Sequence, residues 1–127
     1  MEKRNLIIYW VATLLMSAGM LGSGIGQIMQ AQAMVDILTH LGYPVYFMSI
    51  IGVWKVLAVI VILLPGFKLV KEWAYAGLFF TMTGALISHL IMGDGGKAVA
   101  GPLFQTVFII LSWYFRPASR KINLSNL

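Results

Sequence analysis

The sequence predicts an all-α integral membrane protein, a four-helix bundle of transmembrane helices with the N and C termini in the cytoplasm. Of its 127 residues, 60% are hydrophobic and 10% are charged. In soluble domains, about 45–50% of the residues are apolar and about 25% are charged. Four apolar runs are each long enough to cross a hydrocarbon core about 30 Å thick. The cations gather on one side of these runs, as the positive-inside rule describes.

The four expected spans cover residues 6–29, 45–64, 73–92 and 98–115. Polar or turn-forming residues separate them, and together they make a single transmembrane domain over residues 1–127. A secretory signal peptide is the alternative for the first run, because Ala31-Gln32-Ala33 behind it resembles a cleavage site. The run has about 24 apolar residues, which exceeds the 7–15 of a signal sequence. We therefore expect it to be a span.

The orientation follows from the positions of lysine and arginine. If the chain crosses four times, Lys97 is alone on one side and seven cations share the other, namely Lys3, Arg4, Lys68, Lys71, Arg116, Arg120 and Lys121. This bias predicts that both termini are cytoplasmic and that the protein is multi-pass.

The loop between the first two spans has a helical pattern of its own. Its apolar residues recur at i, i+3, i+4 and i+7 in Met34, Ile37, Leu38 and Leu41, which is typical of an amphipathic helix. Gly42 and Pro44 then end it. We expect a short helix on the outer surface of the membrane.

Small residues repeat along each span at helical spacing. Close approach of small residues is the usual way in which helices associate in lipid, where the hydrophobic effect contributes little. The sequence therefore predicts helix packing at Gly22, Gly26, Gly52, Gly77, Gly84 and Gly101.

Lys55 is the most informative polar residue, because it lies near the middle of the second span, roughly 15 Å from its outer boundary. Side chains lean toward the N-terminus of their helix, so Lys55 leans outward while His89 of the third span leans inward. We expect the two to converge at the depth of Gln105, with Gln27 at the outer end of the first span.

A lysine near mid-bilayer costs about 2.5–3.5 kcal/mol on insertion scales, so it needs a reason. Three alternatives remain open. Asp94 or Asp36 reaches inward as a counter-charge to Lys55, the lysine loses its proton on desolvation, or it holds a polar or anionic head group in an outer-half pocket.

Several kinds of chemistry are excluded. The chain has no cysteine, hence no disulfide, thiolate nucleophile or cysteine-ligated metal. Two histidines are too few for a metal or haem site, and no catalytic arrangement is apparent. Scattered cations argue against a nucleic-acid partner. We therefore expect no enzyme activity from the chain on its own.

Five segments, in this order, resemble the DoxX-like family of small bacterial integral membrane proteins. They are Leu41-Gly42-Tyr43-Pro44, Gly52-Val53-Trp54-Lys55, Lys71-Glu72-Trp73-Ala74-Tyr75-Ala76-Gly77, Gly84-Ala85 with Ser88-His89 and Gly93-Asp94, and Ser112-Trp113-Tyr114 with Arg116-Pro117. The resemblance implies a four-helix bundle of the inner membrane. The family is named for a subunit linked to quinone-dependent sulfur oxidation and terminal oxidase complexes.

The expected function is a redox-associated accessory subunit that binds a quinone or similar amphiphile in an outer-half pocket. Lys55 and His89 would donate to a carbonyl oxygen, and the candidate pocket residues are Lys55, His89, Gln105, Ser88, Trp54 and Gln27. Expected partners are the lipid bilayer, other membrane redox subunits and a second copy of the chain. The alternatives are a ligand-free structural or assembly subunit and a small transporter of an anionic or neutral amphiphile.

Overall fold

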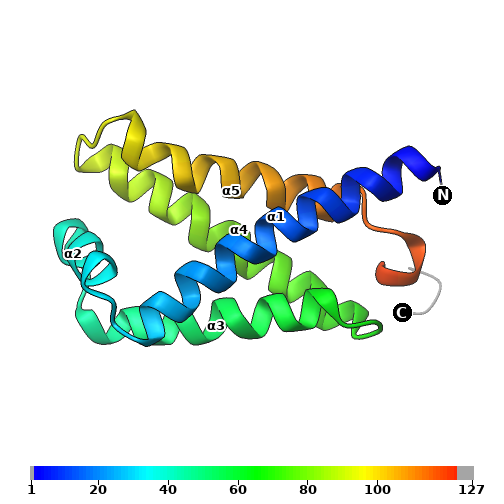
Figure 1. The fold of residues 1–127 in the computed structure, drawn as a ribbon, viewed down its shortest axis with the longest axis horizontal. Helices are drawn as coiled ribbons and strands as arrows, with labels where there is room; N and C mark the ends of the chain where they lie inside the picture. The colour runs from blue at the N-terminus through cyan, green and yellow to red at the C-terminus, as the bar shows by residue number, and fades with distance from the viewer. Residues whose placement is uncertain (1, 123–127) are drawn as a thin grey trace.

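The computed structural model describes residues 2–122, which form five α-helices and a short 3-10 helix (Figure 1). The elements are α1 (Lys3–Ile28), α2 (Gln32–Leu41), α3 (Val45–Leu63), α4 (Lys68–Ile91), α5 (Gly96–Tyr114) and η1 (Ala118–Arg120). This part of the chain contains no strand, so the all-α prediction is confirmed. Residues 1 and 123–127 of the expected domain lie outside it.

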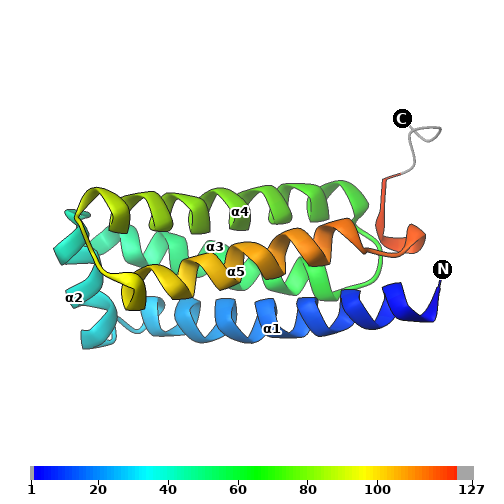
Figure 2. The ribbon, with the colours of Figure 1, turned by 90° about the horizontal axis from the view of Figure 1, so that it is seen from above.

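The four long helices form a ring of neighbours. Figure 2 shows α1 and α4 on opposite sides of the bundle with α3 and α5 between them, and each outer helix packs on both inner ones. The beginning of α1 and η1 lie at one end, which we call the η1 end (Figure 1). At the other end, the α2 end, α2 lies against α3 and α1 near the turn between α4 and α5.

All four predicted spans are confirmed as helices long and apolar enough to cross a membrane. The helices extend beyond the predicted spans mainly at the η1 end, where α1 begins at Lys3 and α4 at Lys68. The apolar pattern ends at the edge of the hydrocarbon, but helical hydrogen bonding continues through charged residues that reach the interface. The spans are therefore correct and their ends differ by a few residues.

The amphipathic helix in the first loop is also confirmed as α2. Gly42 has φ +88°, the left-handed conformation that glycine adopts without a steric penalty. Its N–H donates to the Thr39 carbonyl at 3.1 Å, and that of Tyr43 donates to the Leu38 carbonyl at 3.0 Å. The Leu38 side chain is buried against the bundle, so α2 covers one end of the bundle.

The core is a column of apolar side chains from all four long helices: Met16, Met20, Val59, Ile62, Tyr75, Leu78, Met82 and Ile109. Many other large apolar side chains, such as Ile7, Leu57 and Phe80, are exposed on the outside of the bundle. Exposed apolar surface on this scale indicates contact with lipid rather than water.

Gly52 is one of the glycines predicted to pack between helices, and its surroundings are tight. A Cβ there would stand 2.7 Å from the backbone oxygen of Gly24, so α1 and α3 approach each other closely at this pair. Gly26 meets only the Met34 side chain of α2, at 3.6 Å. At four other positions a Cβ would have nothing within 4 Å among residues 2–122, so a packing role there stays a prediction: Gly22, Gly77, Gly84 and Gly101.

Candidate functional site

The α3 and α4 helices diverge toward the α2 end (Figure 1), and a groove runs between them. It has two compartments that share Ile51, Trp54, Lys55 and Thr81 as lining residues. The compartment toward the α2 end, the α2-side compartment, has a volume of about 330 Å³. The compartment toward the η1 end, the η1-side compartment, has a volume of about 490 Å³.

Lys55 is buried where the two compartments meet. Its side chain starts from the middle of α3, and the residue is only 5% exposed. Its Nζ donates to the hydroxyl of Ser23 on α1 at 3.2 Å. Within residues 2–122, no carboxylate oxygen lies within 4 Å of this ammonium. An ammonium has three N–H donors, so most of its hydrogen-bonding capacity is unused by the chain.

Packing between α1 and α3 holds this lysine in place. A Cβ on Gly24 would stand 3.1 Å from both the Gly52 oxygen and the Cβ of Lys55. No larger residue fits there unless the helices separate. The backbone contact between Gly24 and Gly52 thus places Lys55 one turn beyond it, beside the hydroxyl of Ser23.

Gln27 contributes a second buried polar group to the α2-side compartment. The residue is 7% exposed, and its Oε1 has no hydrogen-bond partner. A buried amide oxygen without a partner is uncommon, because burial removes the water that would otherwise satisfy it. The compartment therefore offers a donor from Lys55 and an amide from Gln27 to anything that enters it.

The remaining walls are mostly apolar. The η1-side compartment is lined by aliphatic residues of α3 and α4 together with Trp54 and Trp73. Thr81 donates its hydroxyl to the Gly77 carbonyl of its own helix at 2.7 Å. Trp54 is 63% exposed on the outside of α3, and no acidic residue lines either compartment.

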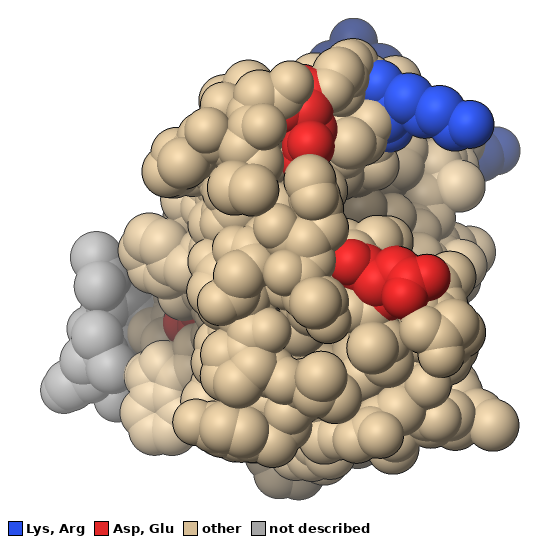
Figure 3. All heavy atoms as spheres, turned by 90° about the vertical axis from the view of Figure 1, so that its left-hand side faces the viewer, with Lys and Arg blue, Asp and Glu red and all other residues tan. Residues whose placement is uncertain are grey.

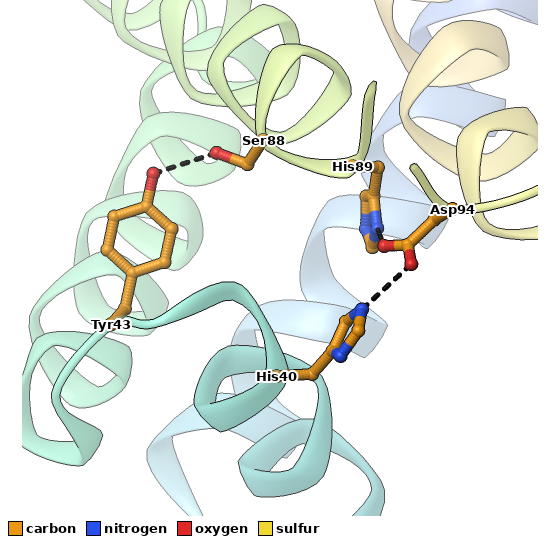
Figure 4. A network of polar contacts seen from close by, with 5 residues as sticks. All are labelled: His40, Tyr43, Ser88, His89 and Asp94. Atoms are coloured by element: carbon orange, nitrogen blue, oxygen red, sulfur yellow. Dashed lines mark hydrogen bonds and ion pairs between the residues drawn. The ribbon is translucent and has the colours of Figure 1, made fainter. Parts of the chain in front are cut away.

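A polar cluster lies at the α2 end of the bundle (Figure 4). Asp94 Oδ1 lies 2.8 Å from His40 Nε2 on α2, and its Oδ2 lies 2.7 Å from His89 Nδ1 on α4. Beside them, the Tyr43 hydroxyl lies 2.8 Å from that of Ser88. We call these five residues the cap network, because they join α2 and the segment after it to the end of α4.

Asp94 is the hub of the cap network. The hydrogen bonds from His89 and then His40 hold the pKa of its carboxyl below the usual value, since they stabilise the ionised form. Leu38, Leu41 and Tyr43, which the network holds in position, are also lining residues of the α2-side compartment. Through Tyr43, the network therefore borders the groove on this side.

The structure divides the predicted pocket residues into three places. Lys55, Trp54 and Gln27 line the groove. His89 and Ser88 belong to the cap network. Gln105 lies inside the bundle against α1, where its amide occupies the space that a Cβ on Gly19 would need. Lys55 and His89 are hydrogen-bonded to different groups, and the lining of the groove includes only the first.

Neither expected counter-charge pairs with Lys55. Asp94 accepts from the two imidazoles of the cap network, and Asp36 accepts from Gln32 Nε2 at 2.8 Å within α2. The expectation that one of them would pair with Lys55 rested on depth in the membrane, which can be calculated from the position of a residue along its helix. The direction in which each side chain points around its helix depends on packing, and packing turns Asp94 toward His89.

Several polar contacts could not be identified from the sequence. Ser23 and His40 were not expected to bond Lys55 and Asp94. In the core, Ser112 Oγ lies 2.6 Å from Thr13 Oγ1 and 2.8 Å from the Tyr75 hydroxyl. The signal for this cluster is weak, since single hydroxyls in apolar helices commonly bond to their own backbone.

The two ends of the bundle differ in charge. At the η1 end, Lys71 and Arg120 donate to backbone carbonyls in the last turn of α3, and Arg116 Nη2 lies 2.9 Å from Glu72 Oε1. The face at the α2 end is largely uncharged, with acidic patches and few cations (Figure 3). A cytoplasmic η1 end, as the positive-inside rule predicts, remains a prediction.

Comparison with known protein families matches residues 11–115 to the DoxX-like family. Comparisons with curated proteins and with solved structures found no match. The matched region begins within α1 and ends just after α5, so it contains the whole groove and the cap network.

Proposed function

The chain belongs to the DoxX-like family, and we propose that this multi-pass membrane protein binds a quinone or similar amphiphile in the groove between α3 and α4. In this proposal it acts as an accessory subunit of a membrane redox complex in the bacterial inner membrane. The chemistry would then belong to the partner subunits, and this chain would hold and orient the amphiphile.

The observation that carries the proposal is the environment of Lys55. Its ammonium is buried beside apolar walls, and within residues 2–122 its one hydrogen bond goes to Ser23. Ionisable groups inside a membrane are costly and are usually functional. A carbonyl oxygen of a ligand would accept one of the unused N–H groups and offset part of that cost.

The walls of the groove suit an amphiphile. Trp54 provides an aromatic surface next to Lys55 for a ring, and the η1-side compartment provides an apolar channel for a tail. Each compartment lies within the range of about 300–1,000 Å³ that is typical of small-molecule sites. A ligand with its head at Lys55 and its tail toward the η1 end would have the direction of a lipid in the outer leaflet.

Binding of a short-chain quinone to the purified protein tests the proposal. The readout is quenching of tryptophan fluorescence, to which Trp54 should contribute most. We expect saturable binding that weakens by about tenfold or more in Lys55→Met, because one hydrogen bond to a charged donor is lost. Lys97→Met is the matched control, since this lysine is exposed outside the groove. Absence of saturable binding, or equal affinity in Lys55→Met, would refute the proposal.

A structural subunit without a ligand is the second candidate, favoured by the tight contact between Gly24 and Gly52 beside the bond from Lys55 to Ser23. These contacts set the register of α1 on α3. If this is their only role, Lys55→Met lowers the thermal stability of the protein in detergent, and no quinone binds to either form.

A further inference from the structure

We infer that the α2-side compartment selects amphiphiles with an anionic head group and a single tail, of which a long-chain carboxylate is the simplest. The inference rests on the proposed groove and names the class of ligand that its charge would favour. It depends on Lys55, Gln27 and the acid-free lining of the groove.

The charge balance of the groove is the first reason. Lys55 is 95% buried by residue area, has no carboxylate within 4 Å among residues 2–122, and shares its compartments with no acidic residue. A buried cation without a counter-charge is unfavourable, and a ligand anion would supply the missing partner. The nearby acids cannot do so, because Asp36 and Asp94 are bonded within α2 and the cap network.

The second reason is the amide nitrogen of Gln27, an available second donor beside Lys55. Gln27 lines the same compartment, is 7% exposed and has an Oε1 without a partner. A primary amide has both donors and an acceptor. Only its Nε2, which makes no hydrogen bond within residues 2–122, can donate to the second oxygen of a carboxylate while Lys55 bonds to the first. The unpartnered Oε1 is an acceptor and does not contribute to binding an anion.

The third reason is the shape of the groove. From Lys55 toward the η1 end, the described lining residues are aliphatic apart from Trp54, Trp73 and Thr81, and the Thr81 hydroxyl is bonded to its own helix. On the α4 side, Gly77 has nothing within 4 Å of the position of a Cβ, so the channel remains open there. At the other end, Leu38, Leu41 and Tyr43 line the α2-side compartment, which has a volume of about 330 Å³. We expect this volume to suit a small head group such as a carboxylate better than a phosphoglycerol head with two chains.

A fluorescent fatty acid and its methyl ester have the same tail but differ in the charge of the head group. Comparing their affinities separates recognition of the charge from hydrophobic binding of the tail. The protein in nanodiscs of phosphatidylcholine is titrated at about pH 8, where a carboxylate is ionised, with cis-parinaric acid or methyl cis-parinarate. Energy transfer from tryptophan reports binding. We expect the acid to bind about tenfold or more tightly than the ester, as close charge pairs at interfaces do.

The variants separate the role of the charge from folding. The ratio of the two affinities should fall to about one in Lys55→Met, remain high in Lys55→Arg and be unchanged in Lys97→Met. Because the ratio is measured within each variant, partial loss of folded protein affects both ligands equally. A ratio below about threefold in the wild type, or an unchanged ratio in Lys55→Met, overturns the inference.

Two further outcomes identify the ligand class. Competition by phosphatidylglycerol as effective as that by the fatty acid would overturn the single-tail part of the inference. Saturable quinone binding without preference for the acid would overturn the inference and leave the proposed function standing. Preference for the acid without quinone binding would support the inference and refute the quinone.

Discussion

Replacing Gly52 by alanine should destabilise the bundle and move Lys55, because α1 and α3 touch at this residue. The new Cβ would stand 2.7 Å from the Gly24 oxygen and 2.9 Å from Cγ1 of Ile28, whereas ordinary contacts begin near 3.4 Å. The Ile28 side chain can rotate away, but the Gly24 oxygen belongs to the helical backbone. The two helices must therefore separate by several tenths of an ångström.

The size of the effect follows from two opposing contributions. Overpacking of a filled contact costs about 1–3 kcal/mol, while alanine in a helix is favoured over glycine by about 0.5–1 kcal/mol. We expect the free energy of unfolding to fall by about 1–2 kcal/mol for Gly52→Ala. Gly22→Ala is the matched control, since Gly22 is exposed on α1 outside the groove and nothing lies within 4 Å of the position of its Cβ. It should leave stability unchanged or raise it by up to about 1 kcal/mol.

The free energy of unfolding of both variants can be measured by reversible unfolding in mixed micelles. The fraction of dodecyl sulfate is increased, and the loss of helix is followed by circular dichroism. Quinone binding to the folded variants gives a second readout, because separation of the helices moves Lys55 away from Ser23 and should weaken binding only in Gly52→Ala. If the two variants unfold within about 0.5 kcal/mol of each other, α1 and α3 do not meet at Gly52, and our account of how Lys55 is positioned fails.

Three other predictions concern the ends and core of the bundle. Asp94→Asn should speed amide exchange in α2 by weakening the cap network, and Asp36→Asn should not. Because its hydrogen bonds lower the Asp94 pKa in the folded state, their contribution is complete above the unfolded value near about 3.9 and is lost as pH falls through the folded value. Protection of α2 in hydrogen exchange should therefore persist from neutral pH to about pH 4 and decline below it. Arg120→Gln removes donors from the carbonyls that end α3 and should cost about 1–2 kcal/mol in detergent unfolding, against less than about 0.5 kcal/mol for the exposed Lys121→Gln. Ser112→Ala leaves two buried hydroxyls without their partner and should cost about 1–3 kcal/mol in the same assay.

The sequence was sufficient for the helices because their signals are local. A span is recognised from about 20 apolar residues in a row, and every predicted span is a helix. The end of α2 is equally local, since Gly42 adopts the left-handed conformation that its position after an apolar stripe predicts. No contact between distant residues is needed for either inference.

The site was predictable only in part. Lys55 was identified because a charge in an apolar run is evident in any sequence, and it does line a groove with Gln27 and Trp54. The meeting of Lys55 with His89 was inferred from depth alone. Depth follows from residue number, but the rotation of each helix about its axis depends on which side chains fit against the neighbouring helices.

The glycines illustrate the same division. Both kinds of glycine recur at the same helical spacing along a span. The sequence therefore does not distinguish a glycine that lets two helices touch from one that leaves a channel open. The sequence by itself determined that four helices are long and apolar enough to cross a membrane, where each lies to within a few residues, and that Lys55 is near the middle of the second of them. Only the tertiary structure decided that Gly24 meets Gly52 while Gly77 and Gly84 face open space. The physical reason is that the length of an apolar run is a property of one segment. Close packing depends on how the surfaces of two helices fit together.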